Sequence, residues 1–292
     1  MNPHDLKTAT PGDNDGVTRI WVHSDLQLAE PELAKVILST AVDDLLERGI
    51  ALDAIWCLGD AHCGSNEAAL QIVAALHIAQ LKRLQVPVYY VLGNHEMDLR
   101  RSKGLSRFPL HDLAMNNSDW YMAALDEFYF CAEFNGFLVV FLSDHAAQDG
   151  RWFTSAGHVA GDGYPFNADS YEKLRRIIRG YNGPVIIAAH YAFPGGQRPN
   201  DFTKQLLPLP ENVRLHLYGH AHIGDLVWNK DDPWQREHPI TGHTQKQINI
   251  SALESLRSPG SHSALLDLHS DGSVELRIRC HLEKKWIADF KF

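Results

Sequence analysis

The chain has 292 residues, 45% of them hydrophobic and 22% charged, which is an ordinary composition for a globular protein. The formal net charge is −9 and no long basic block is present. General binding to nucleic acid or to anionic membranes is therefore disfavoured, because both need clustered Lys and Arg. No apolar run approaches the ~18–20 residues that cross a bilayer, and the N-terminal residues hold no signal-peptide core. We expect a cytoplasmic protein.

The first part of the chain alternates predicted strands with predicted helices. Branched and aromatic residues favour a strand over residues 17–23, and an apolar stripe at helical spacing favours a helix over 31–48. A short strand at 54–58, a helix at 67–84 and a third strand at 87–92 follow. This alternation is typical of a layered α/β sheet, in which ligands bind at the carboxyl ends of the strands.

The later part of the chain is less regular. A helix is predicted around 118–127, and a hairpin over 128–143 turns at Asn135-Gly136. Beyond it we expect a helix at 170–179 and strands at 184–189, 213–218, 247–250, 263–269 and 273–280.

The sequence contains no internal repeat and no clear domain boundary, which favours a single domain over residues 17–292. Residues 1–16 are rich in Pro, Gly, Asn and Asp and are expected to form a flexible tail. Residues 98–127 and 144–168 are expected to be loop or lid insertions, since long loops in compact domains are more often functional than filler.

Polar residues that bind metals gather where predicted strands end. Each alone is weak evidence, because an Asp after a strand is usually a turn residue and a lone His is usually structural. Together they are informative, since adjacent strands of one sheet would bring all these ends to a single edge. The residues are Asp25 with Gln27, Asp60, Asn94 with His95, His190, and His220 with His222.

The types of ligand narrow the choice of metal. Carboxylate, amide oxygen and imidazole together suit Mn²⁺, Fe or Zn²⁺ better than an all-oxygen Ca²⁺ cage or a thiolate zinc cluster. The four cysteines form no CxxC pair, so neither a thiolate zinc site nor a redox motif is indicated and free thiols are expected. Two divalent ions at ~3.5–4 Å need a bridging carboxylate and can share a hydroxide nucleophile.

At this point the sequence resembles the calcineurin-like metallophosphoesterases, whose pattern runs D-x-H, G-D, G-N-H-E, a lone His after a strand, and G-H-x-H. The match covers residue 18 to the C-terminus, and GNHE followed later by GHxH is its specific part. It implies a four-layer α/β sandwich, in which two packed mixed sheets are flanked by helices. The matching segments are Asp25-Leu26-Gln27, Gly59-Asp60, Gly93-Asn94-His95-Glu96, His190 and Gly219-His220-Ala221-His222.

The resemblance also implies a role for each matched residue. Asp60 would bridge two divalent ions. Of the remaining ligands, Asp25, Gln27 and His222 would complete the first site, and Asn94, His190 and His220 the second. His95 would lie beside the scissile phosphate without binding metal, where it would stabilise charge or protonate the leaving oxygen. Glu96 would orient His95 or its loop.

Gln27 departs from the family pattern, which has His at this place. An amide oxygen is a harder ligand than imidazole, so the first site is tilted toward Mn²⁺ or Fe, with Zn²⁺ still possible. The D-x-Q variant is similar to that of manganese-dependent ADP-ribose and CDP-alcohol phosphohydrolases, which makes nucleotides candidate substrates. The alternative is that Gln27 binds no metal and water fills the position.

Several residues next to the matched motifs could be either functional or structural. Arg100 and Arg101 follow the GNHE loop and are candidates to bind a substrate phosphate, although a solvated basic surface is the favoured explanation for them. His23 and His62 adjoin the motifs without matching a ligand position, so supporting or structural roles are expected.

The expected activity is hydrolysis of a small phosphodiester, phosphomonoester or nucleoside diphosphate derivative by a metal-bound hydroxide. A phosphoprotein substrate is disfavoured, since residues 59–65 read GDAHCGS where the protein Ser/Thr phosphatases of the superfamily carry GDxxDRG. The alternative is a binding or scaffold protein of the same fold whose catalytic centre is impaired, for which Gln27 is the supporting observation.

Overall fold

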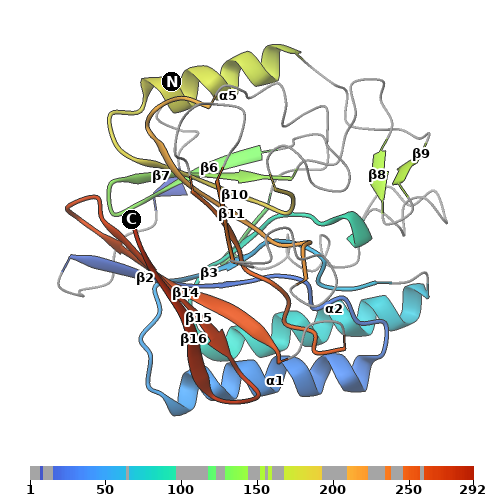
Figure 1. Cartoon of the computed structure of the whole chain (residues 1–292). Coiled ribbons are helices and arrows are strands. Elements are labelled where there is room, and N and C mark those ends of the chain that lie inside the picture. Colours follow the sequence, from blue (N-terminus) through green and yellow to red (C-terminus); the bar gives the residue numbers. More distant parts are fainter. Residues whose placement is uncertain are drawn as a thin grey trace.

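Two β-sheets packed face to face form the centre of the protein, and helices cover the outer face of each (Figure 1). The computed structural model describes residues 16–63, 66–96, 118–122, 129–143, 168–192, 209–222, 234–237, 246–256 and 260–292, and the short strands β1 (Lys7–Thr8), β8 (Trp152–Thr154) and β9 (Gly157–Val159). Helices α1 (Pro31–Glu47) and α2 (Glu67–Leu81) lie on one side, and α5 (Ala168–Gly180) lies on the other. The predicted four-layer α/β sandwich is confirmed.

The first sheet has the order β16-β15-β14-β2-β3-β4-β5 among the described strands. Strand β2 pairs with β3 in parallel, β3 with β4, and β4 with β5, whereas β14, β15 and β16 join as antiparallel neighbours. The strands are β2 (Val17–His23), β3 (Ala54–Cys57), β4 (Val88–Tyr90), β5 (Trp120–Met122), β14 (His262–His269), β15 (Val274–Cys280) and β16 (Lys285–Lys291).

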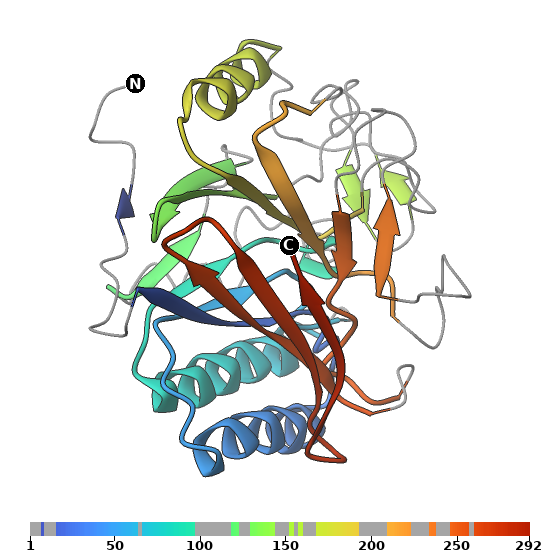
Figure 2. The same cartoon turned by 60° about the vertical axis from the view of Figure 1, so that its left-hand side comes forward.

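The second sheet has the order β1-β6-β7-β10-β11-β13-β12 among the described strands, and its central pairs are parallel (Figure 2). The expected hairpin is present as β6 and β7, with Asn135 and Gly136 at φ values of 48° and 82° in the turn. The strands are β6 (Tyr129–Phe134), β7 (Phe137–Leu142), β10 (Val185–Ala189), β11 (Val213–Tyr218), β12 (Gln235–Glu237) and β13 (Lys246–Asn249).

Strands in both sheets are apolar on both faces, because each face is covered. On β2, Ile20 and Val22 pack into the core between the sheets, while Trp21 packs into the cluster that includes the helices. On β7 the same alternation separates Phe141 from Val140. Burying one large apolar side chain contributes about 1.5–3 kcal/mol, so the two-sided burial of these strands accounts for much of the folding free energy.

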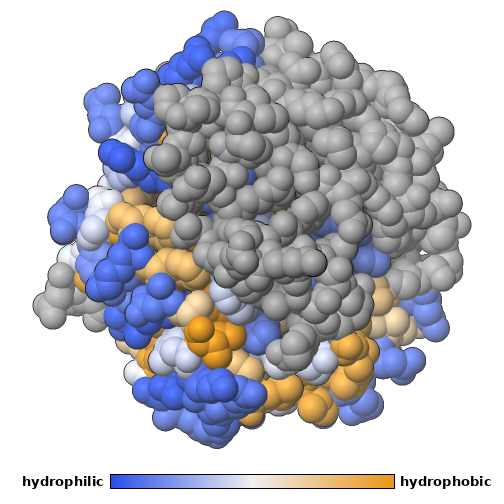
Figure 3. Space-filling view, in the orientation of Figure 1, coloured by the Kyte–Doolittle hydropathy of each residue, from blue (hydrophilic) through white to orange (hydrophobic). Residues whose placement is uncertain are grey.

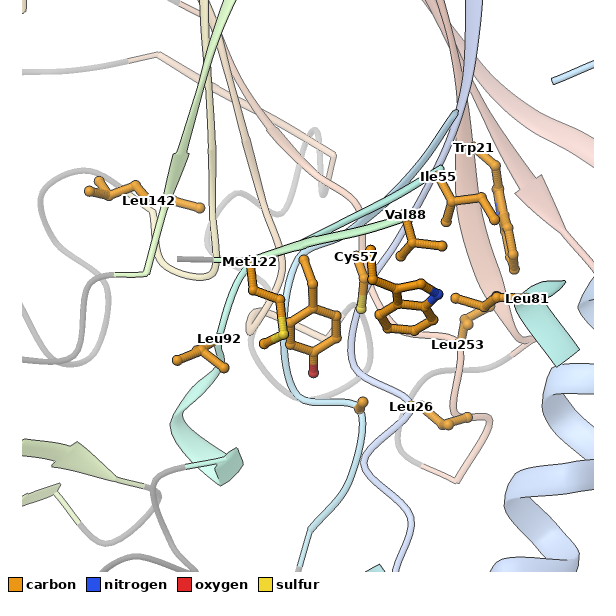
Figure 4. Close-up of a cluster of buried hydrophobic side chains, with 14 of the residues drawn as sticks. Trp21, Leu26, Ile55, Cys57, Leu81, Val88, Leu92, Met122, Leu142 and Leu253 are labelled. Atoms are coloured by element: carbon orange, nitrogen blue, oxygen red, sulfur yellow. The ribbon is translucent and has the colours of Figure 1, made fainter. Parts of the chain in front are cut away.

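The helix-facing core lies between sheet and helices, and Figure 4 shows part of it around Trp21, Cys57 and Leu253. On the outside, large apolar side chains that are more than half exposed are scattered among polar ones over the described surface (Figure 3). No helix in the described part of the chain is long and apolar enough to span a membrane.

One predicted element is wrong. Residues 120–122 lie in the helix expected around 118–127, but they form the edge strand β5, parallel to β4. Aromatic residues fit a pleated, half-buried surface, and Tyr121 stacks on Tyr89 with ring centroids 4.8 Å apart. Cross-strand packing overrode the local helical pattern.

The proposed tail and insertions lie mostly outside the described residues. In the tail, only β1 is described before residue 16, and it pairs in parallel with β6. Residues 98–117, 123–127, 144–151 and 160–167 of the two expected insertions are among those not described.

Candidate metal centre

The predicted ligands converge at one end of the two sheets, and both sheets contribute to the cluster. Asp25, Asp60 and Asn94 follow β2, β3 and β4, whereas His190 and His220 follow β10 and β11 of the other sheet. The expectation that all five ends belong to one sheet is therefore wrong. The parallel strands of both sheets end on the same side, so the face-to-face packing still brings the ligands together.

The first half of the cluster is organised around Asp60, which is fully buried. Its Oδ2 lies 3.1 Å from His190 Nε2, which is also 3.1 Å from Asn94 Oδ1. His190 Nδ1 lies 2.7 Å from the carbonyl oxygen of Leu58, so this nitrogen carries the proton and Nε2 faces the cluster. One ligand atom each of Asp60, His190 and His220 lie within 4.8 Å of one another, which is a spacing that could hold a cation.

The second half is organised around Asp25, whose side chain is also fully buried. Its Oδ2 accepts hydrogen bonds from Ser24 Oγ at 2.6 Å and from the backbone N–H of His220 at 2.8 Å. Its Oδ1 lies 3.0 Å from His222 Nε2. One carboxylate oxygen is thus fixed by the protein, and the other is directed into the cluster.

Gln27 lies between the two halves. Its Nε2 donates to Asp25 Oδ1 at 3.1 Å and to Asp60 Oδ2 at 2.7 Å. Its Oε1 is buried without a hydrogen-bond partner among the described residues. Rotating the amide by half a turn exchanges its two ends and would direct Oε1 at the carboxylates, which is the arrangement that a cation between them requires.

The electrostatics also favour a cation. Burial by itself would lower the pKa of His190, but the carboxylates of Asp60 and Asp25 outweigh burial and raise it to about 9. Burial would likewise raise the pKa of Asp60, yet His190 and His95 hold it well below its usual range. Two buried carboxylates that stay ionised need compensating positive charge, which divalent ions supply. The residues therefore fit a metal centre.

His95 and Glu96 have different surroundings. The backbone N–H of His95 donates to Asp60 Oδ1 at 2.8 Å, and its Nε2 is 4.0 Å from Asp60 Oδ2. The His95 side chain is 17% exposed, so it borders the cluster at its accessible side. Glu96 is fully buried and accepts from Tyr90 Oη and from the backbone of Asp60, Ala61 and Gly93, so it orients the loop, as expected.

Sequence reasoning missed Glu254. This residue follows β13, and its Oε1 lies 3.1 Å from His222 Nδ1. A carboxylate on the far nitrogen fixes the ring orientation and leaves Nε2 to face Asp25. The available signal was the end of one more strand, residues 247–250, with polar residues just beyond it.

Gly59 shows why small residues recur in these loops. It adopts a φ of 93°, and a Cβ at this position would lie 2.6 Å from the backbone nitrogen of Gly93 and 2.9 Å from His190 Nδ1. Any side chain would force apart the loops that carry Asp60 and Asn94. The remaining predicted substrate residues, Arg100 and Arg101, lie outside the described part of the chain.

Solved structures support the fold. A crystal structure of a dimetal phosphatase from Danio rerio is similar with a TM-score of 0.64 at 17% identity, covering 95% of this chain and 99% of that one. A purple acid phosphatase from yellow lupin (Lupinus luteus) is similar with a TM-score of 0.58 at 14% identity, covering 97% of this chain and 54% of that one. Comparison of the sequence with curated proteins gave no match.

The sequence itself identifies the family. The calcineurin-like phosphoesterase family model matches residues 18–224, the stretch that contains every predicted ligand from Asp25 to His222. The chain therefore belongs to the calcineurin-like phosphoesterases and is a metal-dependent hydrolase of phosphoric esters.

Proposed function

We propose that this hydrolase works with two divalent ions and cleaves a small phosphodiester, phosphomonoester or nucleoside diphosphate derivative. The observation that carries the proposal is the position of Asp60 between two groups of ligands. Its Oδ2 lies 3.1 Å from His190 Nε2 on one side and 2.7 Å from the Gln27 amide on the other. A carboxylate shared in this way is what a pair of ions needs.

The ligand assignment follows from this division. Asp60 would be shared by both ions. Asp25, Gln27 and His222 would hold the first ion, and Asn94, His190 and His220 would hold the second. Carboxylate, amide and imidazole ligands favour Mn²⁺ or Fe over Zn²⁺ where Gln27 takes part.

Bound ions would supply charge neutralisation for the phosphoryl oxygens and an activated water nucleophile. The chain's own residues do the rest. Asp25 and Asp60 are held by hydrogen bonds to backbone N–H groups, so they need no reorganisation during the reaction. We assign to His95, whose side chain borders the accessible side, the donation of a proton to the leaving oxygen. Arg100 and Arg101, two residues of the adjoining segment, are proposed to bind the non-reacting part of the substrate.

The decisive experiment separates metal binding from catalysis. Asp60→Asn should abolish metal loading and turnover together. His95→Ala should keep the metal content of the wild type and lose about 10²–10⁴-fold in kcat, the usual contribution of general acid–base catalysis. Turnover would be measured in Mn²⁺ over a panel of mono-, di- and cyclic-phosphate compounds, and metal content by elemental analysis.

His269→Ala is the matched control, because His269 lies at the end of β14 and pairs with Val17, at the opposite end of β2 from Asp25. The His269→Ala variant should have the metal content and the kcat of the wild type. An unchanged kcat for His95→Ala on every substrate would refute the assigned mechanism. Less than one transition metal per chain in the wild type, without hydrolysis of any compound, would favour the scaffold alternative.

A further inference from the structure

A second cluster of potential metal ligands lies on the helix-facing side of the first sheet. His23 ends β2 and Cys57 ends β3, and the two are direct partners in the parallel register. His77 on α2 completes the cluster from the helix layer. One ligand atom of each residue lies within 4.8 Å of the others, and all three residues are buried.

The imidazoles of this cluster are unusual because their polar atoms have no partners. Both ring nitrogens of His23 and of His77 are buried without a hydrogen bond among the described residues, and the same holds for His62. Each neutral ring carries an N–H group, and leaving a buried donor unpaired costs about 1–3 kcal/mol. Such a set of unsatisfied groups needs an explanation.

Other buried histidines of this chain do have partners. His281 lies 2.9 Å from Asp44 and 2.7 Å from Ser263 Oγ, and His216 lies 3.0 Å from Gln247. His281 and His216 thus each have a polar side-chain partner for at least one ring nitrogen. His23 and His77 instead face one another, with ring centroids 5.4 Å apart.

Aromatic and apolar side chains surround the rings of His23 and His77 among the described residues. His23 packs on Trp21 at 4.6 Å, and His77 contacts Trp120 at 6.1 Å. Cys57 belongs to the hydrophobic cluster that includes Trp21 and Leu253 (Figure 4). Burial, together with His62, lowers the pKa of His77 to about 3, so the ring is neutral and its nitrogen lone pair is available. Burial raises the pKa of the Cys57 thiol, and a coordinated cation reverses that preference.

We propose that His23, Cys57 and His77 bind a single Zn²⁺ in a closed structural site, separate from the phosphoesterase centre. Two imidazoles and one thiolate are ligands that Zn²⁺ prefers, and such a site is dry and has no place for a substrate. Binding would release the thiol proton of Cys57 to solvent, leaving one thiolate and two neutral imidazoles on the ion. Tetrahedral zinc spaces its ligand atoms by about 3.3–3.6 Å, so the cluster would contract slightly.

We infer that His62 is the fourth ligand, because it lies near enough for its charge to lower the pKa of His77 and both of its ring nitrogens are buried without a partner among the described residues. The proposed zinc site lies where two strands lead into the loops of the phosphoesterase centre. His23 and Cys57 are the last residues of the strands that lead to Asp25 and Asp60. Zinc there would tie these two strand ends to α2 and hold the catalytic loops in place. The absence of any CxxC spacing follows, because the three ligands come from three separate elements.

Cobalt substitution tests the proposal directly. Full-length protein produced with Co²⁺ should show thiolate-to-cobalt charge-transfer absorption in the near ultraviolet, because no predicted ligand of the phosphoesterase centre is a thiolate. Cys57→Ser should lose this absorption and about one equivalent of tightly held metal. Cys131→Ser, a buried free thiol on β6, and Cys63→Ser, beside Gln27, should retain both.

Histidine variants keep the test decisive if Cys57→Ser does not fold. His77→Phe preserves a ring in the helix layer and should lose the absorption and the same metal equivalent, while mono- and diester hydrolysis in excess Mn²⁺ is measured separately. X-ray absorption of zinc-loaded wild type should show a sulfur ligand. No charge-transfer absorption in the wild type, or equal absorption in wild type and Cys57→Ser, would overturn the proposal, and failure of hydrolysis alone would bear only on the proposed function.

Discussion

Four residues of the candidate metal centre have backbone conformations that side chains rarely adopt. Asp25, Gln27, Asp60 and His220 have φ values of 53°, 41°, 54° and 64°. Each left-handed residue costs of order 1–3 kcal/mol, so the surrounding hydrogen bonds must hold it in place. The backbone N–H of Asp25 donates to the backbone carbonyl oxygen of Gly59 at 3.0 Å. The backbone N–H of Gln27 donates to the backbone carbonyl oxygen of Asp60 at 2.9 Å. Strain concentrated in these loops fits residues that are placed for ligand binding.

At the residue scale the sequence predicted which side chains meet, because residue type and position after a strand are visible in it. It could not predict Glu254, whose contact with His222 depends on how the chain returns to the centre after β13. It also gave His23 and His62 only supporting or structural roles. Their missing partners became evident only when the packing around them was known.

Gln27→His provides a prediction at this scale. Imidazole is a more favourable ligand for Zn²⁺ than an amide oxygen, so the variant should gain Zn²⁺ affinity relative to Mn²⁺ by about tenfold or more. Activation of chelator-treated enzyme by each metal, titrated against a phosphodiester, would measure the ratio.

Gln27→Ala is the companion variant and should weaken the first site for both metals without reversing the preference. If Gln27→His and Gln27→Ala had the metal preference of the wild type, Gln27 would not bind metal. Water would then fill its position.

At the element scale, a buried ionic group joins α1 to β15. Arg279 donates to Asp44 through Nε at 2.8 Å and Nη2 at 2.7 Å, and all of these atoms belong to residues about 1% exposed. The sequence predicted both α1 and this strand, but it could not pair residues so far apart. Local sequence patterns predict individual helices and strands, but how these pack together depends on contacts between residues far apart in the chain. Strand β5 is a second example, because it forms by pairing with β4.

The Asp44 group should stabilise the fold in a pH-dependent way. Burial would raise the pKa of Asp44, but the Arg279 and His281 contacts outweigh it and lower the pKa well below the usual value. A depressed carboxyl pKa contributes stability that is present above the unfolded pKa of ~3.9 and is lost as pH falls below it. Asp44→Asn should therefore cost about 3–5 kcal/mol at pH 7, with the difference from wild type shrinking below about pH 4.

Denaturant unfolding at several pH values would measure this difference. Asp43→Asn is the matched control, because Asp43 pairs with Arg83 at 2.6 Å on the surface, where both side chains are 40% or more exposed. It should cost less than about 1 kcal/mol at any pH. Equal costs for the two variants at pH 7 would contradict the importance of the buried group.

At the scale of the whole molecule, the metal centre is a junction between the two sheets. Asp25, Asp60 and Asn94 belong to loops of one sheet, while His190 and His220 belong to loops of the other. The sequence predicted the layers correctly and the location of the ligands only in part. Which strands share a sheet depends on long-range pairing that local periodicity does not encode. Ligand binding across the junction should therefore couple to the stability of the entire sandwich.

Metal removal should lower the melting temperature, and the decrease should grow with pH. An ion present at 100 times its Kd stabilises the folded state by about 2.7 kcal/mol. In chelator-treated protein the carboxylates of Asp60 and Asp25 would raise the pKa of His190 to about 9. A raised pKa gives stability that is complete below the unfolded value of ~6.5 and is lost as pH rises through the folded pKa. Metal-loaded protein keeps a neutral His190 as ligand and avoids this loss.

Thermal melts of metal-loaded and chelator-treated protein at pH 6, 7.5 and 9 would test this pH dependence. The gap, which is the difference in melting temperature between the two forms, should be widest at pH 9. His190→Gln should remove much of the pH dependence, because the titrating group is gone while an amide still reaches toward Asp60. His269→Ala, far from the centre, should leave the dependence intact. A gap that stays constant from pH 6 to 9 would show that His190 does not exchange a proton for metal, and the second ion position would then need a different ligand.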